Sequence, residues 1–368
     1  MYIYILFFLL SFFFIYIAKK YEKMKAISTF FEIISIALLS FLAAIRDESI
    51  GTDVNTYVKP IFETFVQYGK NAFEVGSYFN VELGYNLFNY IISIFTDKFY
   101  ILLFFIQFFI LTFSFWGIKK MYPKNYVLAY SIFILIAYNR SLNIVRQLMA
   151  IALCVYALSY LFKENYKKFF FIVIIASIFH SSSLIFLVIY IIYKLVLKKN
   201  MNQYLLSMGI FGFGFILFMF FEPLINIFVN LHLFSSKYIY YLTNYVSNSL
   251  NFNLIEIAID VFFIFIYLIF SKVYNSKDKR SKLYFVLLVV DLTCLIISSR
   301  YSSAYRISMY FNIPTLVYFL SNFKLILNEK NDKNFITSLI GIFIAFIYWY
   351  VLYVMGNAGN TVPFISAL

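Results

Sequence analysis

The sequence predicts an all-α, polytopic membrane protein, a bundle of about 10–13 transmembrane helices. Of its 368 residues, 63% are hydrophobic and only 13% are charged, whereas soluble proteins carry about 45–50% apolar and about 25% charged residues. The apolar residues also form continuous runs of about 20 residues, the length that crosses a bilayer as a helix. Transmembrane β-strands would be shorter and alternating. A soluble enzyme and a disordered chain are therefore excluded.

The spans are expected where these apolar runs lie, within one integral-membrane domain over residues 1–368 with outer loops 46–82 and 223–252. A weaker run covers 83–96. The strong runs cover 2–18, 27–45, 99–118, 126–139, 141–162, 169–197, 204–222, 253–271, 283–299, 303–322 and 335–354.

Basic residues gather at alternate ends of the runs. The loops after residues 18, 118, 162, 197, 271 and 322 hold most of the 30 Lys and Arg residues. By the positive-inside rule these loops are cytoplasmic, and both chain ends lie outside. The net charge of +13 does not indicate nucleic-acid binding, because the charges sit at span ends and not in one patch.

This orientation constrains two segments. Segment 83–96 should be an interfacial or re-entrant helix, because a crossing there would place the lysines after residue 118 outside. Segment 169–197 has lysines at both ends, so it should be a hairpin of two short helices. Its break is expected at the polar stretch Phe179-His180-Ser181-Ser182-Ser183. Irregular backbone at membrane depth must be satisfied by protein or water, so this break should line a cavity.

The six arginines are distributed differently from the lysines. Five lie on the predicted outer side or just inside its membrane boundary, namely Arg46, Arg140, Arg146, Arg300 and Arg306. A guanidinium binds phosphate in a planar, bidentate manner and stays charged when partly buried. Ionisable groups inside a membrane are costly and are candidates for function.

The first outer motif reads Arg46-Asp47-Glu48-Ser49-Ile50-Gly51-Thr52-Asp53 and is followed by Tyr57. Arg46 and Asp53 could instead form a structural ion pair around a turn at Gly51 and Thr52. The same loop continues through Glu82, which adds a further carboxylate.

The second motif runs from Arg140 to Ala150. The spacing predicts that Asn143, Arg146, Gln147 and Ala150 share one helical face. Polar packing onto the bundle is the alternative, although an arginine about one turn inside a span must meet an anion or water.

Three further features are candidates for chemistry or packing. His180 lies at the expected hairpin break, where a histidine can accept a proton at neutral pH. Arg300 and Arg306 flank the outer start of a span that also contains Tyr310. Asp291 lies deeper in a run and is expected to hydrogen-bond between helices. No nucleotide-binding, zinc or serine-elbow motif occurs, and Cys154 and Cys294 indicate no disulfide framework, so no metal or cofactor is predicted.

In this order, the motifs resemble the EpsG-like branch of the Wzy-type bacterial polysaccharide polymerases. The resemblance covers roughly residues 40–320. The residues that carry it are Arg46…Ile50-Gly51-Thr52-Asp53…Tyr57, Asn143-x-x-Arg146-Gln147-x-x-Ala150, Phe179-His180-Ser181-Ser182 and Tyr305-Arg306-x-x-x-Tyr310. One departure is that loop 46–82 is compact, so part of the acceptor surface is expected from 223–252.

The resemblance implies a glycosyltransferase of the bacterial inner membrane with its active site facing outward. Such enzymes join oligosaccharide repeat units carried on undecaprenyl diphosphate into O-antigen, capsule or exopolysaccharide, without a nucleotide sugar or a required metal. The implied partners are the lipid-linked oligosaccharide and membrane lipid, with a chain-length regulator and a flippase as further candidates.

Roles can be assigned from the chemistry of that reaction, in which the leaving diphosphate needs cations and the acceptor hydroxyl needs a base. We expect Arg146 and Arg306 to bind the diphosphate with support from Arg46 and Arg300. His180 is the expected base, with Asp53 as the alternative. The remaining substrate-binding candidates are Tyr57, Asn143, Gln147 and Tyr310.

Two other classes of function fit the same topology. A flippase for lipid-linked oligosaccharides would need cations along a path between the two faces, whereas the arginines here gather at one face. A polysaccharide ligase or a membrane acyltransferase would share the topology but use another acceptor or donor.

Overall fold

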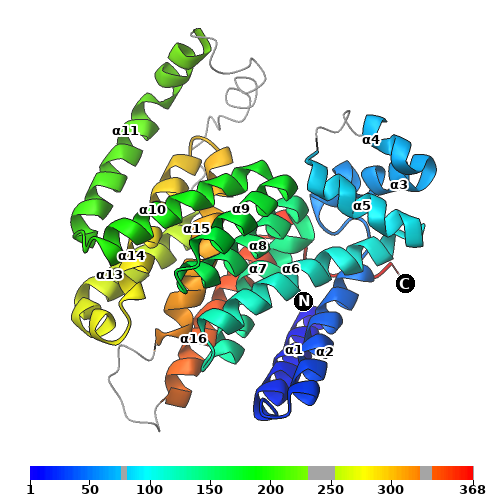
Figure 1. Cartoon of the computed structure of the whole chain (residues 1–368), viewed down its shortest axis with the longest axis horizontal. Coiled ribbons are helices and arrows are strands. Elements are labelled where there is room, and N and C mark those ends of the chain that lie inside the picture. The colour runs from blue at the N-terminus through cyan, green and yellow to red at the C-terminus, as the bar shows by residue number, and fades with distance from the viewer. Residues whose placement is uncertain (76–80, 231–252, 324–333, 368) are drawn as a thin grey trace. The chain divides into compact units, whose positions relative to one another are not determined.

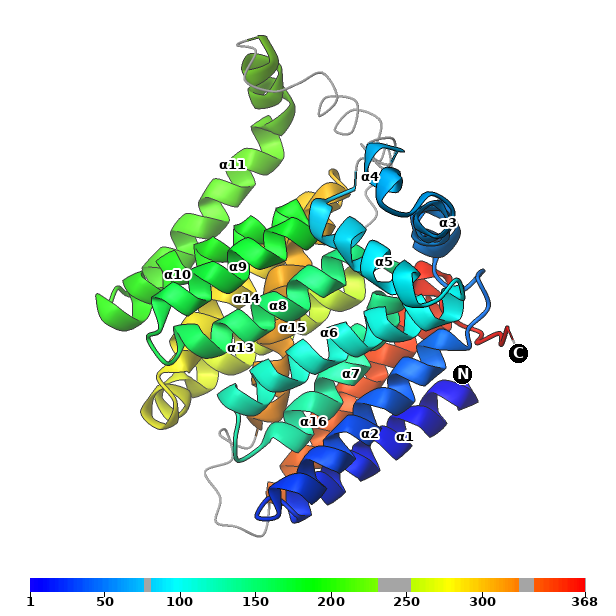
Figure 2. The ribbon, with the colours of Figure 1, turned by 45° about the vertical axis from the view of Figure 1, so that its right-hand side comes forward.

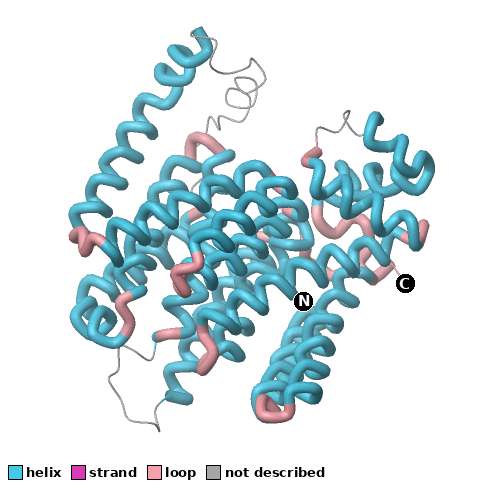
Figure 3. Tube along the Cα trace, in the orientation of Figure 1, coloured by secondary structure: helices cyan, strands magenta, loops and turns pink. Residues whose placement is uncertain are grey.

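In the computed structural model, all residues are described except 76–80, 231–252, 324–333 and 368. Every regular element among the described residues is a helix (Figure 3). The all-α prediction is therefore confirmed. Part of the outer loop 223–252 lies outside the described residues, and so do His232 and Lys237.

Contacts divide the chain into two compact units, Met1–Phe186 with Ser338–Leu368 and Leu187–Thr337. The helices are labelled in Figure 1. The first unit contains α1 (Tyr2–Lys20), α2 (Lys25–Ala44), α3 (Lys59–Tyr68), α4 (Ala72–Val75), α5 (Leu83–Phe95), α6 (Phe99–Met121), α7 (Tyr126–Asn143), α8 (Val145–Leu161), α9 (Tyr166–Phe179) and most of α16 (Asn334–Trp349). The second contains α10 (Leu187–Tyr193), α11 (Gln203–Asn230), α13 (Leu254–Lys277), α14 (Arg280–Ser298) and α15 (Ser303–Ser321).

Eight helices among the described residues are long and apolar enough to cross a membrane, which makes the chain a multi-pass membrane protein. They include α1, α2, α6, α11, α13, α14 and α16, and the apolar stretch Ser181–Lys198. The other predicted spans correspond to α7, α8, α9 and α15, which are shorter or carry more polar side chains. Helix α5 has 13 residues, fewer than the about 20 that a straight span needs.

The predicted break in segment 169–197 is confirmed. Helix α9 ends at Phe179, and His180 is extended, with φ −157° and ψ 115°. A short 3₁₀ turn, Ser181–Phe186, follows. The ring of Phe186 then lies 6.3 Å from that of Phe169, so the chain has turned back along α9. This reversal places His180 at the tip of the hairpin.

The first unit is held together by polar contacts between apolar helices and by the C-terminal segment. The hydroxyls of Ser11 on α1 and Ser35 on α2 lie 2.7 Å apart. Tyr4 on α1 donates a hydrogen bond to the carbonyl of Thr361 at 2.6 Å. The N–H of Asp47 donates to the carbonyl of Ile365 at 2.8 Å. The C-terminal segment therefore fixes the start of loop 46–82.

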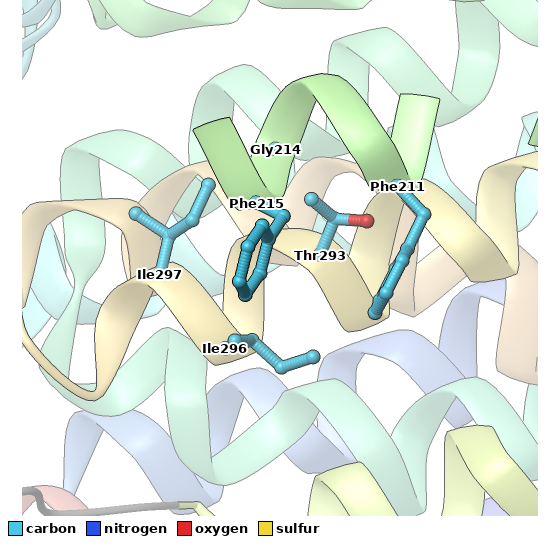
Figure 4. Close-up of a pocket in the computed structure, with 6 residues that line it drawn as sticks. All are labelled: Phe211, Gly214, Phe215, Thr293, Ile296 and Ile297. Atoms are coloured by element: carbon cyan, nitrogen blue, oxygen red, sulfur yellow. The ribbon is translucent and has the colours of Figure 1, made fainter. Parts of the chain in front are cut away.

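The second unit has a buried polar contact and a small apolar crevice. Asn312 on α15 donates to Asp291 on α14 at 2.7 Å, with both residues buried, which confirms the interhelical hydrogen bond expected of Asp291. Figure 4 shows the crevice where α11 meets α14. A Cβ on Gly214 would lie 2.0 Å from the Cγ2 of Thr293, so only glycine permits this approach. The crevice is lined by Phe211, Gly214, Phe215, Thr293, Ile296 and Ile297.

We expect cysteine labelling to reproduce the orientation predicted by the lysines. In a variant lacking Cys154 and Cys294, Lys163→Cys and Lys277→Cys should resist an impermeant maleimide in intact cells, because the positive-inside rule assigns their loops to the cytoplasm. Lys237→Cys should react without permeabilisation. All three should react after permeabilisation, which controls for accessibility. Strong labelling of Lys277→Cys in intact cells would contradict the orientation.

Candidate active site

The carboxylate of Glu82 lies at the centre of a cluster of residues from three parts of the first unit. Its Oε2 accepts a hydrogen bond from Nη1 of Arg146, at the start of α8. Its Oε1 lies 2.9 Å from Nδ1 of His180 at the hairpin tip. The same Oε1 accepts from the backbone N–H of Ser181 at 3.2 Å. One carboxylate thus connects a cation and an imidazole that are distant in sequence.

The three central side chains are partly exposed, at 20% for Arg146, 19% for Glu82 and 18% for His180. A group from outside can therefore approach them. The Nε of Arg146 is buried and makes no hydrogen bond with the described residues. Nε2 of His180 likewise has no hydrogen-bond partner among the described residues. Each residue therefore has a polar atom that the described residues leave unpaired.

Tyr57 connects this cluster to the loop motif. The guanidinium carbon of Arg146 lies 4.5 Å from the centre of the Tyr57 ring, an arrangement in which cation and ring attract each other. The Tyr57 hydroxyl donates to Oδ2 of Asp53 at 2.7 Å. Burial and the neighbouring Asp53 carboxylate raise the pKa of Tyr57 well above its usual value. The tyrosine therefore stays neutral and donates a hydrogen bond to Asp53.

The turn at Gly51 is fixed by Asn143. The amide oxygen of Asn143 accepts from the Thr52 hydroxyl at 2.8 Å and from the Asp53 N–H at 3.2 Å. Gly51 has φ +87°, and a Cβ there would lie 2.3 Å from the carbonyl oxygen of Leu142. Only glycine fits this position. Asn143 therefore holds the loop that carries Asp53 and Tyr57.

The prediction that Asn143 shares a helical face with Arg146, Gln147 and Ala150 is wrong. Helix α7 ends at Asn143, and Ile144 has φ −88° and ψ 66° before α8 begins. The break turns Asn143 toward the loop while Arg146 contacts Glu82. Gln147 is buried in α8 at 1% exposure.

The environment keeps Glu82 ionised. Burial acts to raise the pKa of its carboxyl, but contact with His180 and the charge of Arg146 together outweigh burial and lower the pKa to about 2. Since an exposed glutamate titrates at about 4.3, the contacts of Glu82 stabilise the fold at neutral pH. This contribution is lost as the pH falls below about 4.

Arg46 lies just beyond α2 and is 4% exposed. Its Nε and Nη1 are buried and make no hydrogen bond with the described residues. The alternative of a structural pair with Asp53 is not observed among the described residues, where no ion pair joins the two side chains. Burial lowers the pKa of Arg46 to about 10, against the influence of the Tyr138, Tyr4 and Tyr85 hydroxyls. Arg46 is therefore a buried cation at neutral pH.

Arg300, Arg306 and Tyr310 belong to the second unit. Arg306 is exposed at the start of α15. The guanidinium carbon of Arg300 lies 5.5 Å from the centre of the Tyr301 ring. Tyr310 is fully buried in α15, which indicates packing within the unit. Arg140, also an outer-side arginine in the sequence, is buried and donates to the Tyr348 hydroxyl.

Sequence reasoning noted Glu82 as a loop carboxylate but did not place it in the site. Its position depends on Gly84, two residues later in α5. A Cβ on Gly84 would lie 2.8 Å from the carbonyl oxygen of Ile178, so glycine lets α5 approach the end of α9. This approach places Glu82 beside His180. The short sequence Glu82-Leu83-Gly84 was the available signal.

Replacing Gly84 with Ala should therefore weaken the site. The new Cβ would meet both the Ile178 carbonyl and its Cγ2 at 2.9 Å, which forces α5 away from α9. We expect lower activity in a polymer assay and a lower melting temperature, by a few degrees. Gly209→Ala in α11 is the matched control, because nothing lies within 4 Å of its Cβ position and its backbone is not in the left-handed region. Full activity of Gly84→Ala would show that the close approach is not required.

Among the described residues, no group of three or more His, Cys, Asp or Glu side chains could hold a metal ion. The cluster can instead bind an anion at Arg146 and accept a proton at His180.

No curated protein and no solved structure matched the chain. The model of the EpsG family matches residues 29–366. Because this match spans nearly the whole chain, the protein belongs to the EpsG family.

Proposed function

We propose that this protein polymerises oligosaccharide repeat units carried on undecaprenyl diphosphate, on the outer face of the bacterial inner membrane. The observation that supports it most is the single Glu82 carboxylate that contacts both Arg146 and His180. Glycosyl transfer from a lipid diphosphate needs these two functions side by side. Membership of the EpsG family supports a role in polysaccharide biosynthesis.

In this proposal Arg146 stabilises the leaving group. When the bond between the anomeric carbon and the diphosphate oxygen breaks, negative charge develops on that oxygen. A preorganised guanidinium offsets this charge without rearranging. The contacts with Glu82 and the Tyr57 ring fix the guanidinium plane, and the remaining N–H groups are available to phosphate oxygens.

His180 accepts the proton of the acceptor hydroxyl. In this proposal Nδ1, which lies 2.9 Å from Oε1 of Glu82, carries the proton of the imidazole, and Nε2 carries the free lone pair. The acceptor oxygen forms the new bond to the anomeric carbon, its proton moves to Nε2, and the lipid diphosphate departs. Glu82 stabilises the imidazolium that results, as the carboxylate does in a catalytic triad.

The other candidates have supporting roles. Asp53 positions the Tyr57 ring beneath Arg146 through its 2.7 Å hydrogen bond, and remains the alternative base. Asn143 fixes the loop that carries both. Arg46, whose Nε and Nη1 are buried and make no hydrogen bond with the described residues, supports the diphosphate. The diphosphate role expected of Arg300 and Arg306, which belong to the second unit, stays a prediction.

The proposal predicts that Glu82→Gln nearly abolishes polymerisation. Glutamine keeps the size of the side chain but removes the charge that orients His180 and Arg146. We expect at least a hundredfold loss, the order seen for a misplaced base, measured as polymer length on a gel with protein abundance checked in membranes. Glu63→Gln is the matched control, since Glu63 is 61% exposed and pairs with Lys59 at 3.8 Å, away from the Glu82 cluster. Normal ladders from Glu82→Gln would contradict the proposal that Glu82 orients the catalytic residues.

The same gel, combined with an impermeant probe of the outer face, separates the rival functions. A polymerase that lacks its site leaves single repeat units on the lipid at the outer face. A ligase defect would leave long lipid-linked chains untransferred. A flippase defect would leave single units on the cytoplasmic face, where an impermeant periodate or lectin probe does not reach them.

A further inference from the structure

We infer that the lysine-bearing ends of α6, α8 and α9 form a binding site for an anionic phospholipid, with its phosphate held between Lys120 and Lys168. The three helices pack side by side in the first unit (Figure 2). The site is separate from the Glu82 cluster, because Lys120 ends α6 and Tyr160 ends α8, whereas Arg146 begins α8.

The first part of the site is a lysine between two tyrosines. Nζ of Lys120 donates to the hydroxyls of Tyr156 at 2.9 Å and Tyr160 at 3.0 Å. It also lies 4.4 Å and 4.6 Å from the centres of the two rings. The hydroxyls themselves lie 2.9 Å apart.

This arrangement has more hydrogen-bond donors than acceptors. Two of the three N–H groups of Lys120 and one of the two tyrosine O–H groups are used within the cluster. One ammonium hydrogen and one hydroxyl hydrogen remain without an acceptor among the described residues. Nζ of Lys168 lies 5.5 Å from the centre of the same Tyr160 ring and adds further donors. A phosphate, whose oxygens only accept, complements such a set.

Other lysines at neighbouring helix ends differ from Lys120 and Lys168, because each of them pairs with a carboxylate. Lys119, adjacent to Lys120, pairs with Glu32 at 2.6 Å, and Lys19 pairs with Glu22 at 2.6 Å. Lys120 and Lys168 pair with no carboxylate in the described part of the chain. Their charge is left for an external anion.

The close packing of α6 on α8 brings Lys120 to the two tyrosines. A Cβ on Gly117 would lie 2.7 Å from the carbonyl oxygen of Val155 and 2.9 Å from Cα of Tyr156. Glycine therefore lets α6 approach α8 one turn before Lys120. This contact brings the ammonium group to the two tyrosines.

An apolar surface continues from each lysine into the span. Trp116, one turn before Lys120, is 46% exposed, and Phe171, one turn after Lys168, is 64% exposed. These positions share a helical face with the lysines. A lipid with its phosphate at the lysines would place acyl chains on these side chains. The positive-inside rule assigns this end to the cytoplasmic leaflet, where anionic lipids attract basic residues. This favours a phospholipid over free phosphate.

Native mass spectrometry of the full chain, with phosphatidylglycerol and phosphatidylcholine offered together, tests the inference. Wild type should retain phosphatidylglycerol preferentially. The Lys120→Gln/Lys168→Gln variant should lose about fivefold in apparent affinity per lysine, equivalent to about 1 kcal/mol for each basic residue. Lys20→Gln/Lys23→Gln removes the same charge from the same predicted face and should behave as wild type. Lys120→Arg/Lys168→Arg should keep most of the binding.

Equal losses in the two glutamine variants, or no loss in either, would overturn the inference. Displacement of the lipid by millimolar inorganic phosphate would also overturn it, since free phosphate would then be the ligand. A photoreactive phosphatidylglycerol on the wild-type protein avoids dependence on variant folding. It should crosslink to peptides around Trp116, Lys120 and Lys168, and crosslinks confined to other segments would contradict the site. None of these readouts depends on polymerase activity.

Discussion

His180→Gln should reduce polymerisation by about 10²–10⁴-fold, the usual contribution of a general base. Glutamine keeps a similar size and one hydrogen bond toward Glu82, but it cannot accept a proton. Nδ1 of His180 contacts Glu82 at 2.9 Å while Nε2 has no partner among the described residues. The substitution should therefore leave the fold and donor binding intact and remove only proton transfer.

The measurement is the rate of chain extension with a purified lipid-linked repeat unit, together with donor binding by the same variant. His232→Gln, at the chain's only other histidine, is the control and should polymerise normally. If His180→Gln kept close to the wild-type rate, His180 would be a packing residue at the hairpin tip. The proton would then pass to Asp53 or to water.

Arg146→Lys should lose about 10²–10³-fold in rate, the cost typical of removing one oxyanion donor, despite keeping the positive charge. Lysine cannot reproduce the planar fork that contacts Glu82 while lying 4.5 Å from the Tyr57 ring centre. We expect the loss chiefly in kcat, because the charge that Arg146 stabilises develops in the transition state.

Arg280→Lys is the matched control, since Arg280 pairs with Asp278 at 2.8 Å and lies in a loop that is predicted to be cytoplasmic. It should retain polymerisation within about twofold, because the charge of this partly buried pair is kept and the pair lies outside the proposed site. If Arg146→Lys produced wild-type ladders, the role of Arg146 would depend only on its positive charge and not on the geometry of its guanidinium.

The membrane helices could be predicted from sequence because the signal is local. Apolar runs and the lysines at their ends predicted the limits of α1, α6 and α14 to within a few residues. The break at His180 was also local, since the only polar stretch of its segment coincided with the point where flanking lysines required a return.

The centre of the site could not be predicted because it depends on contacts between distant segments. Glu82 meets Arg146 and His180 only because Gly84 lets α5 approach Ile178. Likewise, the spacing from Asn143 to Arg146 suggested one helical face, but the backbone at Ile144 separates them. Spacing predicts a shared face only within an unbroken helix.

The most direct test of the proposed function uses the purified protein in liposomes with one substrate, a repeat unit on undecaprenyl diphosphate, and no nucleotide sugar. Product length and released undecaprenyl diphosphate are measured together for wild type and Glu82→Gln. We predict a ladder of products in wild type, one lipid diphosphate released per bond formed, and neither in the variant. Lipid diphosphate release without chain growth, or a ladder from Glu82→Gln equal to that of wild type, would contradict the proposal.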